Sequence, residues 1–194
     1  AKISLERMGE VYQQEEDPDF IEEKTIEFPT GTESSIELRD VAFRYPSAAM
    51  SWALKDVNLE IPEGKVTAIV GISGSGKTTL LKLLMALHEP TEGEVLLGGL
   101  PLRDYDGRRW RNRCGVVMQD GYLFDDTIER NIACDEGPID VERMRAAVEL
   151  AALDDVLAKK SKGLKTAIGT TGTGLSGGER QRVLIARALY NEPD

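Results

Sequence analysis

A glycine-rich segment between an apolar stretch and a helical pattern constrains this chain more than any other feature. Val66 to Val70 (VTAIV) is continuously apolar, as expected of a strand that is covered on both faces. Gly71–Thr79 follows it directly, and Leu80–Leu87 then has the composition of a helix. A strand that enters a glycine loop and then a helix is typical of α/β proteins. We therefore expect an α/β fold with this loop at the end of a buried strand.

The loop itself fits the pattern G-x-x-x-x-G-K-[S/T] from Gly71 to Thr78. In such a loop the glycines let successive backbone N–H groups turn toward phosphate oxygens, and the following helix presents its positive end. Lys77 can reach the β- and γ-phosphates, and the Thr78 hydroxyl can bind Mg²⁺. We expect a nucleoside triphosphate to bind the residues of this loop, which are Gly71, Ile72, Ser73, Gly74, Ser75, Gly76, Lys77, Thr78 and Thr79.

Other interpretations of the loop fit less well. A glycine-rich turn that only caps a helix remains the structural alternative. A dinucleotide-binding fingerprint would need a third glycine, but Gly74-x-Gly76-x-x leads to Thr79. A protein kinase is excluded because the sequence contains neither H-R-D nor D-F-G.

Composition narrows the class further. The chain has 24 Lys and Arg against 34 Asp and Glu, a net charge of -10, which disfavours nucleic acid as a partner. Apolar residues make up 41%, enough for a core. Cys114 and Cys134 with the single His88 argue against a disulfide scaffold or a zinc site, and we expect His88 near a helix end. No apolar stretch reaches the length of a membrane span.

Periodicity predicts the other elements. Alternation across one register slip predicts half-buried antiparallel strands at Ile36–Tyr45 and Val57–Ile61. Further strands are expected at Glu94–Leu97 and, buried, at Val116–Met118. Helices are expected within 1–14, over Val141–Lys160 and over Ser176–Tyr190, and residues 15–34 are an acidic linker.

A second segment, Leu175-Ser176-Gly177-Gly178-Glu179-Arg180-Gln181, opens the last predicted helix. Ser176 and Glu179 have the spacing of a capping box, which is the purely structural interpretation. Gly177 and Gly178 each cost about 1 kcal/mol of helix stability relative to alanine. They also leave the helix start bare, which suits a second surface that contacts phosphate.

With both segments in this order, the chain closely resembles the nucleotide-binding domain of ABC (ATP-binding cassette) transporters of the exporter type. Leu175–Gln181 resembles the signature motif of that family, with Glu179 where glutamine is usual. The resemblance implies a P-loop NTPase core, an antiparallel β subdomain and an α-helical subdomain at about 120–175, within a domain at 35–194. It also implies ATP and Mg²⁺ as cofactors and a head-to-tail dimer. In that dimer Leu175, Ser176, Gly177, Gly178 and Glu179 of one copy contact the ATP held by the other.

The resemblance assigns three further positions. Tyr45 matches the aromatic residue that stacks on adenine, although a tyrosine at a strand end has a structural alternative. Gln119 matches the glutamine that approaches Mg²⁺ and the attacking water, so Lys77 and Gln119 are the catalytic candidates, and Thr78 and Gln119 the metal candidates. Leu123–Ile132 resembles the segment that faces the coupling helices of the membrane domain. Thr166–Gly172 occupies the place of an exporter loop whose usual glutamate is Thr170 here.

The implied function is that of an ATP-binding motor domain of an exporter, attached through residues 1–34 to a transmembrane domain and placed at the cytoplasmic face of the membrane. In the family, an apolar strand ending in Asp-Glu follows the signature helix, and this sequence ends at Asn191–Asp194 where that strand would begin. We therefore expect marginal stability or self-association. A hydrolytically inert nucleotide-binding fragment and a non-transport ABC ATPase remain alternatives. Peptides are one candidate cargo, beside lipids and drugs.

Overall fold

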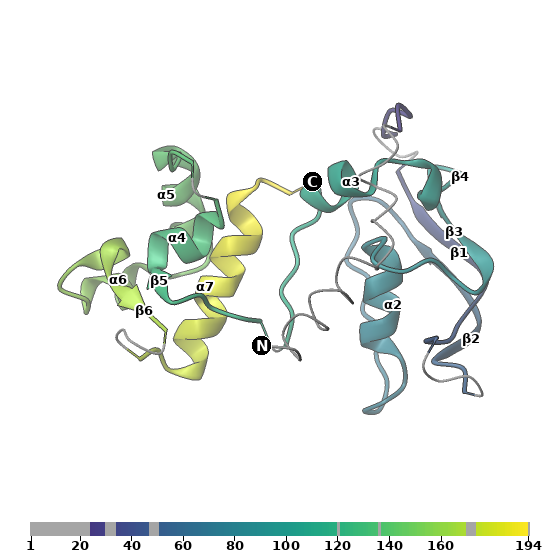
Figure 1. The fold of residues 1–194 in the computed structure, drawn as a ribbon, viewed down its shortest axis with the longest axis horizontal. Helices are drawn as coiled ribbons and strands as arrows, with labels where there is room; N and C mark the ends of the chain where they lie inside the picture. The colour runs from purple at the N-terminus through teal and green to yellow at the C-terminus, as the bar shows by residue number, and fades with distance from the viewer. Residues whose placement is uncertain are drawn as a thin grey trace, which may run out of the picture. The chain divides into compact units, whose positions relative to one another are not determined.

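The computed structural model describes residues 24–29, 34–46, 51–119, 121–135, 137–169 and 174–193 (Figure 1). These residues form two compact units, divided between Trp110 and Arg111. Each unit has a hydrophobic core of its own. The predicted helix within 1–14 and the predicted loop position Thr170 lie outside the described residues.

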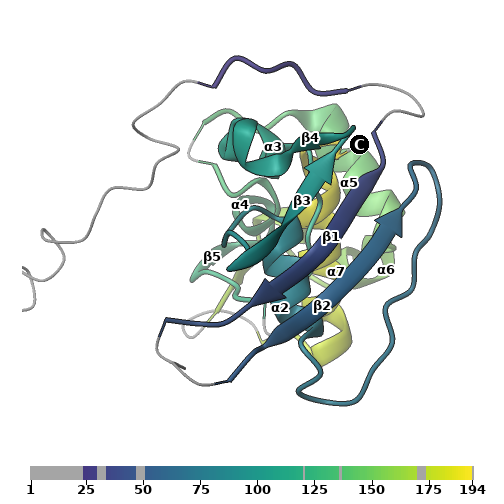
Figure 2. The same cartoon turned by 90° about the vertical axis from the view of Figure 1, so that its right-hand side faces the viewer.

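An antiparallel sheet forms the frame of the first unit. Its strands are β1 (Ile36–Phe43), β2 (Leu54–Ile61), β3 (Glu92–Leu97) and β4 (Leu100–Pro101), in the order β2-β1-β3-β4. Figure 2 shows the three longer strands side by side. Pairing shifts register after Leu38, and Asp40 there has a φ of 49°. The predicted antiparallel strands with a slip in β1 are confirmed.

Helix α2 (Lys77–Leu84) covers one face of this sheet. Leu80 and Leu83 point into the core beside Leu38, Val41 and Val95 of the strands. The helix ends three residues earlier than the predicted Leu87. A 3₁₀ turn, η3 (Leu102–Asp104), and the short helix α3 (Gly107–Asn112) follow the sheet. Because Leu80 and Leu83 anchor α2 in the core, the loop between β2 and α2 is attached to the core at its C-terminal end.

The predicted buried strand at Val66–Val70 is wrong for this structure. Val66 and Val70 are 100% and 90% exposed, and Ile72 is 82% exposed. The other predicted buried strand, Val116–Met118, has no strand structure either. A continuous apolar sequence becomes an interior strand only when neighbours pair with both of its edges. Within the described part of the chain, neither sheet includes these two segments.

Helices dominate the second unit. They are α4 (Ile128–Ala133), α5 (Val141–Leu150), α6 (Asp154–Ala158) and α7 (Gly177–Tyr190), with a 3₁₀ turn η4 (Gly163–Lys165) and a two-stranded ribbon of β5 (Asp126–Thr127) and β6 (Ala167–Ile168). Helix α7 packs against α4 and α5. The predicted helical stretch 141–160 breaks where Ala152 adopts a φ of 51°, so it forms two helices. None of the helices in the described ranges is long and apolar enough to cross a membrane.

The exposed apolar segment leads to a prediction about association. Extended apolar chain without a paired neighbour is a template for contact between copies. We expect Val70→Lys to lower concentration-dependent self-association, measured by sedimentation velocity. Val141→Lys is the matched control, because Val141 is 73% exposed on α5 and the charge change is identical. A stable wild-type monomer with a cooperative, high-temperature melt would contradict this account, as would an equal effect of the control.

Candidate functional site

Two glycines shape the loop that precedes α2. Gly74 and Gly76 have φ values of 81° and 90°, a region that residues with side chains rarely adopt. A Cβ on Gly76 would lie 2.6 Å from the Ala53 carbonyl oxygen, so a side chain there would clash with the backbone. Gly76 is also the N-cap of α2, and no side chain caps the helix. The first N–H groups of α2 are therefore left open to an anion.

The Lys77 ammonium group lies inside this loop. Its Nζ donates to the carbonyl oxygens of Gly71 and Ile72, both at 2.8 Å, and lies 3.4 Å from the Ser75 hydroxyl oxygen. Neutral carbonyls are weaker partners for an ammonium group than the oxygens of a phosphate. The loop thus holds one positive side chain in the place where the sequence predicts phosphates.

The two threonines after Lys77 differ in burial. Thr79 is buried, and its hydroxyl lies 3.3 Å from the phenol oxygen of Tyr45. Thr78 is exposed at the first turn of α2, so its hydroxyl is accessible. The Thr79 hydroxyl is therefore occupied by its contact with Tyr45, whereas the accessible Thr78 hydroxyl is the candidate metal ligand.

Tyr45 lies against the same helix as the loop. Its hydrogen bond to Thr79 is the main cause that lowers the pKa of the phenol, and Lys82 acts in the same direction against desolvation. The Lys82 ammonium lies 5.5 Å from the centre of the Tyr45 ring, and Phe43 and His88 contact the ring edge-on. Tyr45 and the loop are separated in the sequence, but Tyr45 contacts α2, the helix that follows the loop. His88 lies just beyond the end of α2, as predicted.

The second segment has the predicted capping box at the start of α7. The Glu179 N–H donates to the Ser176 hydroxyl oxygen at 3.3 Å, and the Ser176 N–H donates to the Glu179 carboxylate at 2.8 Å. The bond from the Ser176 backbone N–H to the carboxylate is the main cause that lowers the pKa of Glu179, and the Ser176 side chain acts in the same direction. Open space surrounds the positions where Gly177 and Gly178 would carry side chains. The start of α7 is therefore accessible, and the residue before it, Leu175, is half-buried.

Gln119 is exposed in a turn of the second unit. The segment at the start of α7 belongs to the same unit. Tyr45 and Gly71–Thr79 belong to the first unit. The predicted site residues therefore fall into two groups, and the role of Gln119 beside the loop stays a prediction.

Two residues that the sequence did not single out hold the chain after Gln119. The Asn131 side chain is fully buried; its Oδ1 accepts the Phe124 N–H at 2.7 Å, and its Nδ2 donates to the Phe124 carbonyl at 3.0 Å. Arg187 of α7 donates to the Tyr122 carbonyl at 2.8 Å and to the Asn131 carbonyl at 2.7 Å. Tyr122 and Phe124 are thereby fixed with exposures of 66% and 51%. Asn131 bonds to Phe124, only seven residues away, but no sequence motif marks that contact, and the partners of Arg187 lie more than fifty residues away.

Among the residues that the structure describes, the side chains that could bind a metal ion near the loop are few, and their chemistry limits which ion fits. The described residues contain no group of three or more His, Cys, Asp or Glu side chains that could hold a metal ion. Mg²⁺ needs no such group when it binds with a nucleotide, because it keeps waters and takes phosphate oxygens with one or two protein ligands. The exposed Thr78 hydroxyl fits that requirement.

The chain is similar to known proteins over most of its length. A family model described as "ABC transporter" covers residues 54–194. The leukotoxin export ATP-binding protein LtxB of Aggregatibacter actinomycetemcomitans is 39% identical over 192 residues, 98% of this chain and 26% of that protein. The ATP-dependent lipid A-core flippase of Burkholderia orbicola is 44% identical over 157 residues, 81% of this chain and 26% of that protein.

A solved structure is also similar, a bacterial Atm1-family ABC exporter with ATP bound. It has a TM-score of 0.76 and 37% identity over 82% of this chain and 28% of that chain. This likeness confirms the predicted α/β fold. The chain spans about a quarter of the length of the curated relatives that it matches.

The capping box predicts a pH dependence of α7. Because the pKa of Glu179 is lowered on folding, its stabilising effect is present above the ordinary pKa of glutamate. That effect is lost as the pH falls through the lowered value. We expect Glu179→Gln, which keeps the hydrogen-bonding shape without titrating, to reduce the loss of helicity on acidification in far-UV circular dichroism. Glu149→Gln, at an exposed position outside the capping box, is the control. Identical acid transitions in wild type and Glu179→Gln would refute the assignment.

Proposed function

Because the chain belongs to the ABC transporter family and matches the nucleotide-binding domains of exporters, we propose that it binds ATP on Tyr45 and the Gly71–Thr79 loop. As part of the intact domain, it drives transport by hydrolysing ATP. One observation carries this proposal: the Lys77 ammonium lies inside a glycine loop whose following helix has no side-chain cap. An open helix start with a central cation is built for the phosphates of a nucleotide.

The described contacts suggest how ATP is held. Phosphate oxygens replace the carbonyls of Gly71 and Ile72 as partners of Lys77, because a charged acceptor binds an ammonium group more strongly. The adenine stacks on Tyr45, whose ring is oriented by its contact with Thr79. Thr78 and Gln119 are the proposed Mg²⁺ ligands, and the ion supplies positive charge to the phosphates.

For hydrolysis, water attacks the γ-phosphate and ADP leaves with inorganic phosphate. Lys77 stabilises the negative charge that spreads over the transferred phosphoryl group. The Gln119 side chain orients the attacking water through its amide oxygen. Both roles are proposals that follow from the family and from the accessible position of each side chain.

We propose that two copies of this chain pair head to tail around ATP. The support is the accessible start of α7, where Gly177 and Gly178, next to the exposed Ser176, have backbone N–H groups with no side chain above them. This helix has 14 residues, long enough to carry a positive end. The same surface on each copy would then complete the site of the other.

The partner in the membrane has a candidate contact surface. Tyr122 and Phe124 form an exposed edge-to-face pair, 5.4 Å between ring centres, supported by Asn131 and Arg187. Rigidly held, exposed aromatic residues are typical of protein interfaces. We propose that this pair contacts the membrane domain at the cytoplasmic face. Peptide is the first candidate cargo and lipid the second, and the names of two relatives mention leukotoxin and lipid A-core.

ATP binding is tested by calorimetric titration with Mg-ATP. We expect Lys77→Ala to weaken binding at least about 100-fold, because charged hydrogen bonds to phosphate are lost in an open site. Lys65→Ala, which removes an exposed lysine from the segment before the loop, should bind like the wild type. Unchanged affinity in Lys77→Ala, or no binding by the wild type, would overturn the proposal.

Pairing is tested separately by sedimentation of the chain with Mg-ATP. We expect Ser176→Arg to leave the affinity of the monomer for ATP unchanged and to abolish nucleotide-dependent pairing, because a long cation blocks the start of α7. Ser161→Arg adds the same charge at an exposed position of the same unit and should pair normally. Equal pairing of Ser176→Arg and wild type would refute the head-to-tail arrangement.

A further inference from the structure

An extended segment at the beginning of the described chain lies on the first unit. Lys24–Pro29 has no helix or strand, and its sequence predicts an acidic linker. Phe28 and Pro29 are nevertheless half-buried, whereas Ile26 is exposed. The segment is therefore docked through particular side chains rather than through its whole length.

Phe28 is the centre of this docking. Its ring stacks on Tyr105 with 5.2 Å between ring centres and an interplanar angle of 12°. It also stacks on Trp110 at 6.1 Å and 28°. The Arg109 guanidinium lies 5.5 Å from the Phe28 ring centre, and it pairs with Glu27 at 3.6 Å. Offset stacks of this kind contribute beyond the burial of apolar area.

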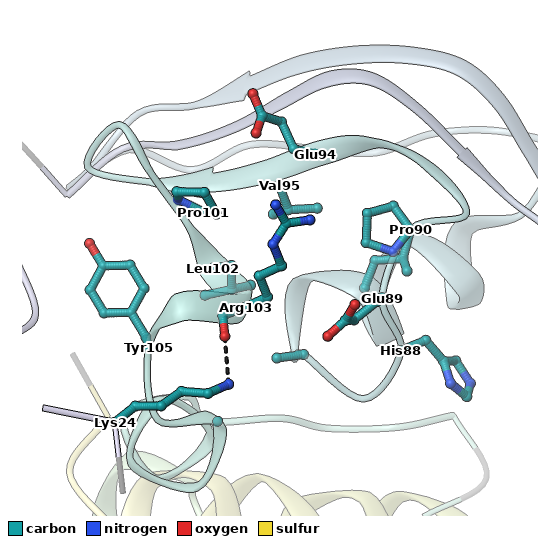
Figure 3. A pocket seen from close by; sticks show the side chains of 13 residues that line it. Lys24, His88, Glu89, Pro90, Glu94, Val95, Pro101, Leu102, Arg103 and Tyr105 are labelled. Atoms are coloured by element: carbon teal, nitrogen blue, oxygen red, sulfur yellow. Dashed lines mark hydrogen bonds between the residues drawn. The ribbon is translucent and has the colours of Figure 1, made fainter. Parts of the chain in front are cut away.

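Lys24 fixes the other end of the segment. Its Nζ donates to the Arg103 carbonyl oxygen, as the dashed line in Figure 3 shows. Lys24 lines a cavity of about 70 Å³ together with Leu83 of α2 and Tyr105. The docked segment thus borders the same core that α2 enters.

Trp110 connects the docked segment to the nucleotide loop. Its indole N–H donates to the Leu84 carbonyl at 2.8 Å, and Leu84 is the last residue of α2. Helix α2 begins at Lys77, inside the loop. Phe28, Trp110 and Leu84 also pack against one hydrophobic cluster. One helix therefore joins the docked segment at its C-terminal end to the phosphate loop at its N-terminal end.

From this arrangement we infer that docking of Lys24–Pro29 and nucleotide binding favour each other. The inference rests on the proposed function of the loop. Both events stabilise the same position of α2: the nucleotide orders its first turn, and Trp110 holds its last carbonyl. A ligand binds more tightly when part of the ordering has already occurred, and the effect is reciprocal. The segment that leads into this unit therefore senses whether the loop is loaded.

Trypsin cleavage after Lys24, followed by mass spectrometry of the full chain, measures docking directly. We expect saturating Mg-ATP to slow this cleavage about fivefold in the wild type. Phe28→Ala should raise the cleavage rate without nucleotide by about two- to tenfold, because the ring stack is lost. It should also weaken Mg-ATP binding about fivefold. Ile26→Ala, on the exposed side of the same segment, should change neither quantity.

Trp110→Phe separates coupling from docking. The smaller ring keeps an aromatic surface for Phe28 but removes the N–H that binds Leu84. We expect this variant to retain the slow cleavage after Lys24 without nucleotide and to lose the further protection by Mg-ATP. Protection equal to that of the wild type would overturn the proposed path through Trp110.

The outcomes also separate this inference from the proposed function. If wild type and Phe28→Ala bind Mg-ATP equally well and Mg-ATP does not slow cleavage, the coupling is refuted while the nucleotide site stands. If the wild type binds no Mg-ATP, the proposed function fails, and the coupling fails with it. Faster cleavage of Phe28→Ala without nucleotide supports the docking in either case.

Discussion

The close approach of Gly76 to the backbone at Ala53 is the constraint on which the proposed nucleotide site depends. Only a residue without a side chain fits there, so α2 must begin with a left-handed glycine and without a side-chain cap. The open helix start then has the Lys77 ammonium beside it. Burial of Leu80 and Leu83 against the sheet holds the helix in place. The conformation of Gly76 thus determines both how α2 begins and the open helix start of the proposed nucleotide site.

The sequence predicts those features whose determinants are local. The capping box of Ser176 and Glu179 and the slip in β1 depend on residues within a few positions of one another, and both are confirmed. The strand prediction for Val66–Val70 is wrong because an apolar pattern indicates only that a segment can be buried. It does not indicate which neighbouring strand would pair with that segment. The contacts of Arg187 could not be predicted either, since they depend on partners more than fifty residues away, and no sequence motif marks the shorter-range contact between Asn131 and Phe124.

The predicted site residues divide between the two units. The first unit carries the loop, Tyr45 and the docked segment around Phe28. The second carries Gln119, the start of α7 and the exposed aromatic pair. Helices link the parts in each unit: α2 joins the loop to Trp110, and Arg187 of α7 supports the segment after Gln119. We propose that nucleotide binding acts on both helices, and through them on the membrane partner.

Amide hydrogen exchange with and without Mg-ATP tests the central claim most directly. The account predicts slower exchange for the amides of Gly74–Thr79, because these N–H groups would bind phosphate oxygens that replace water. It also predicts slower exchange near Trp110, at the other end of α2. Unchanged exchange in Gly74–Thr79 at saturating Mg-ATP would contradict the assignment of this loop as the nucleotide site.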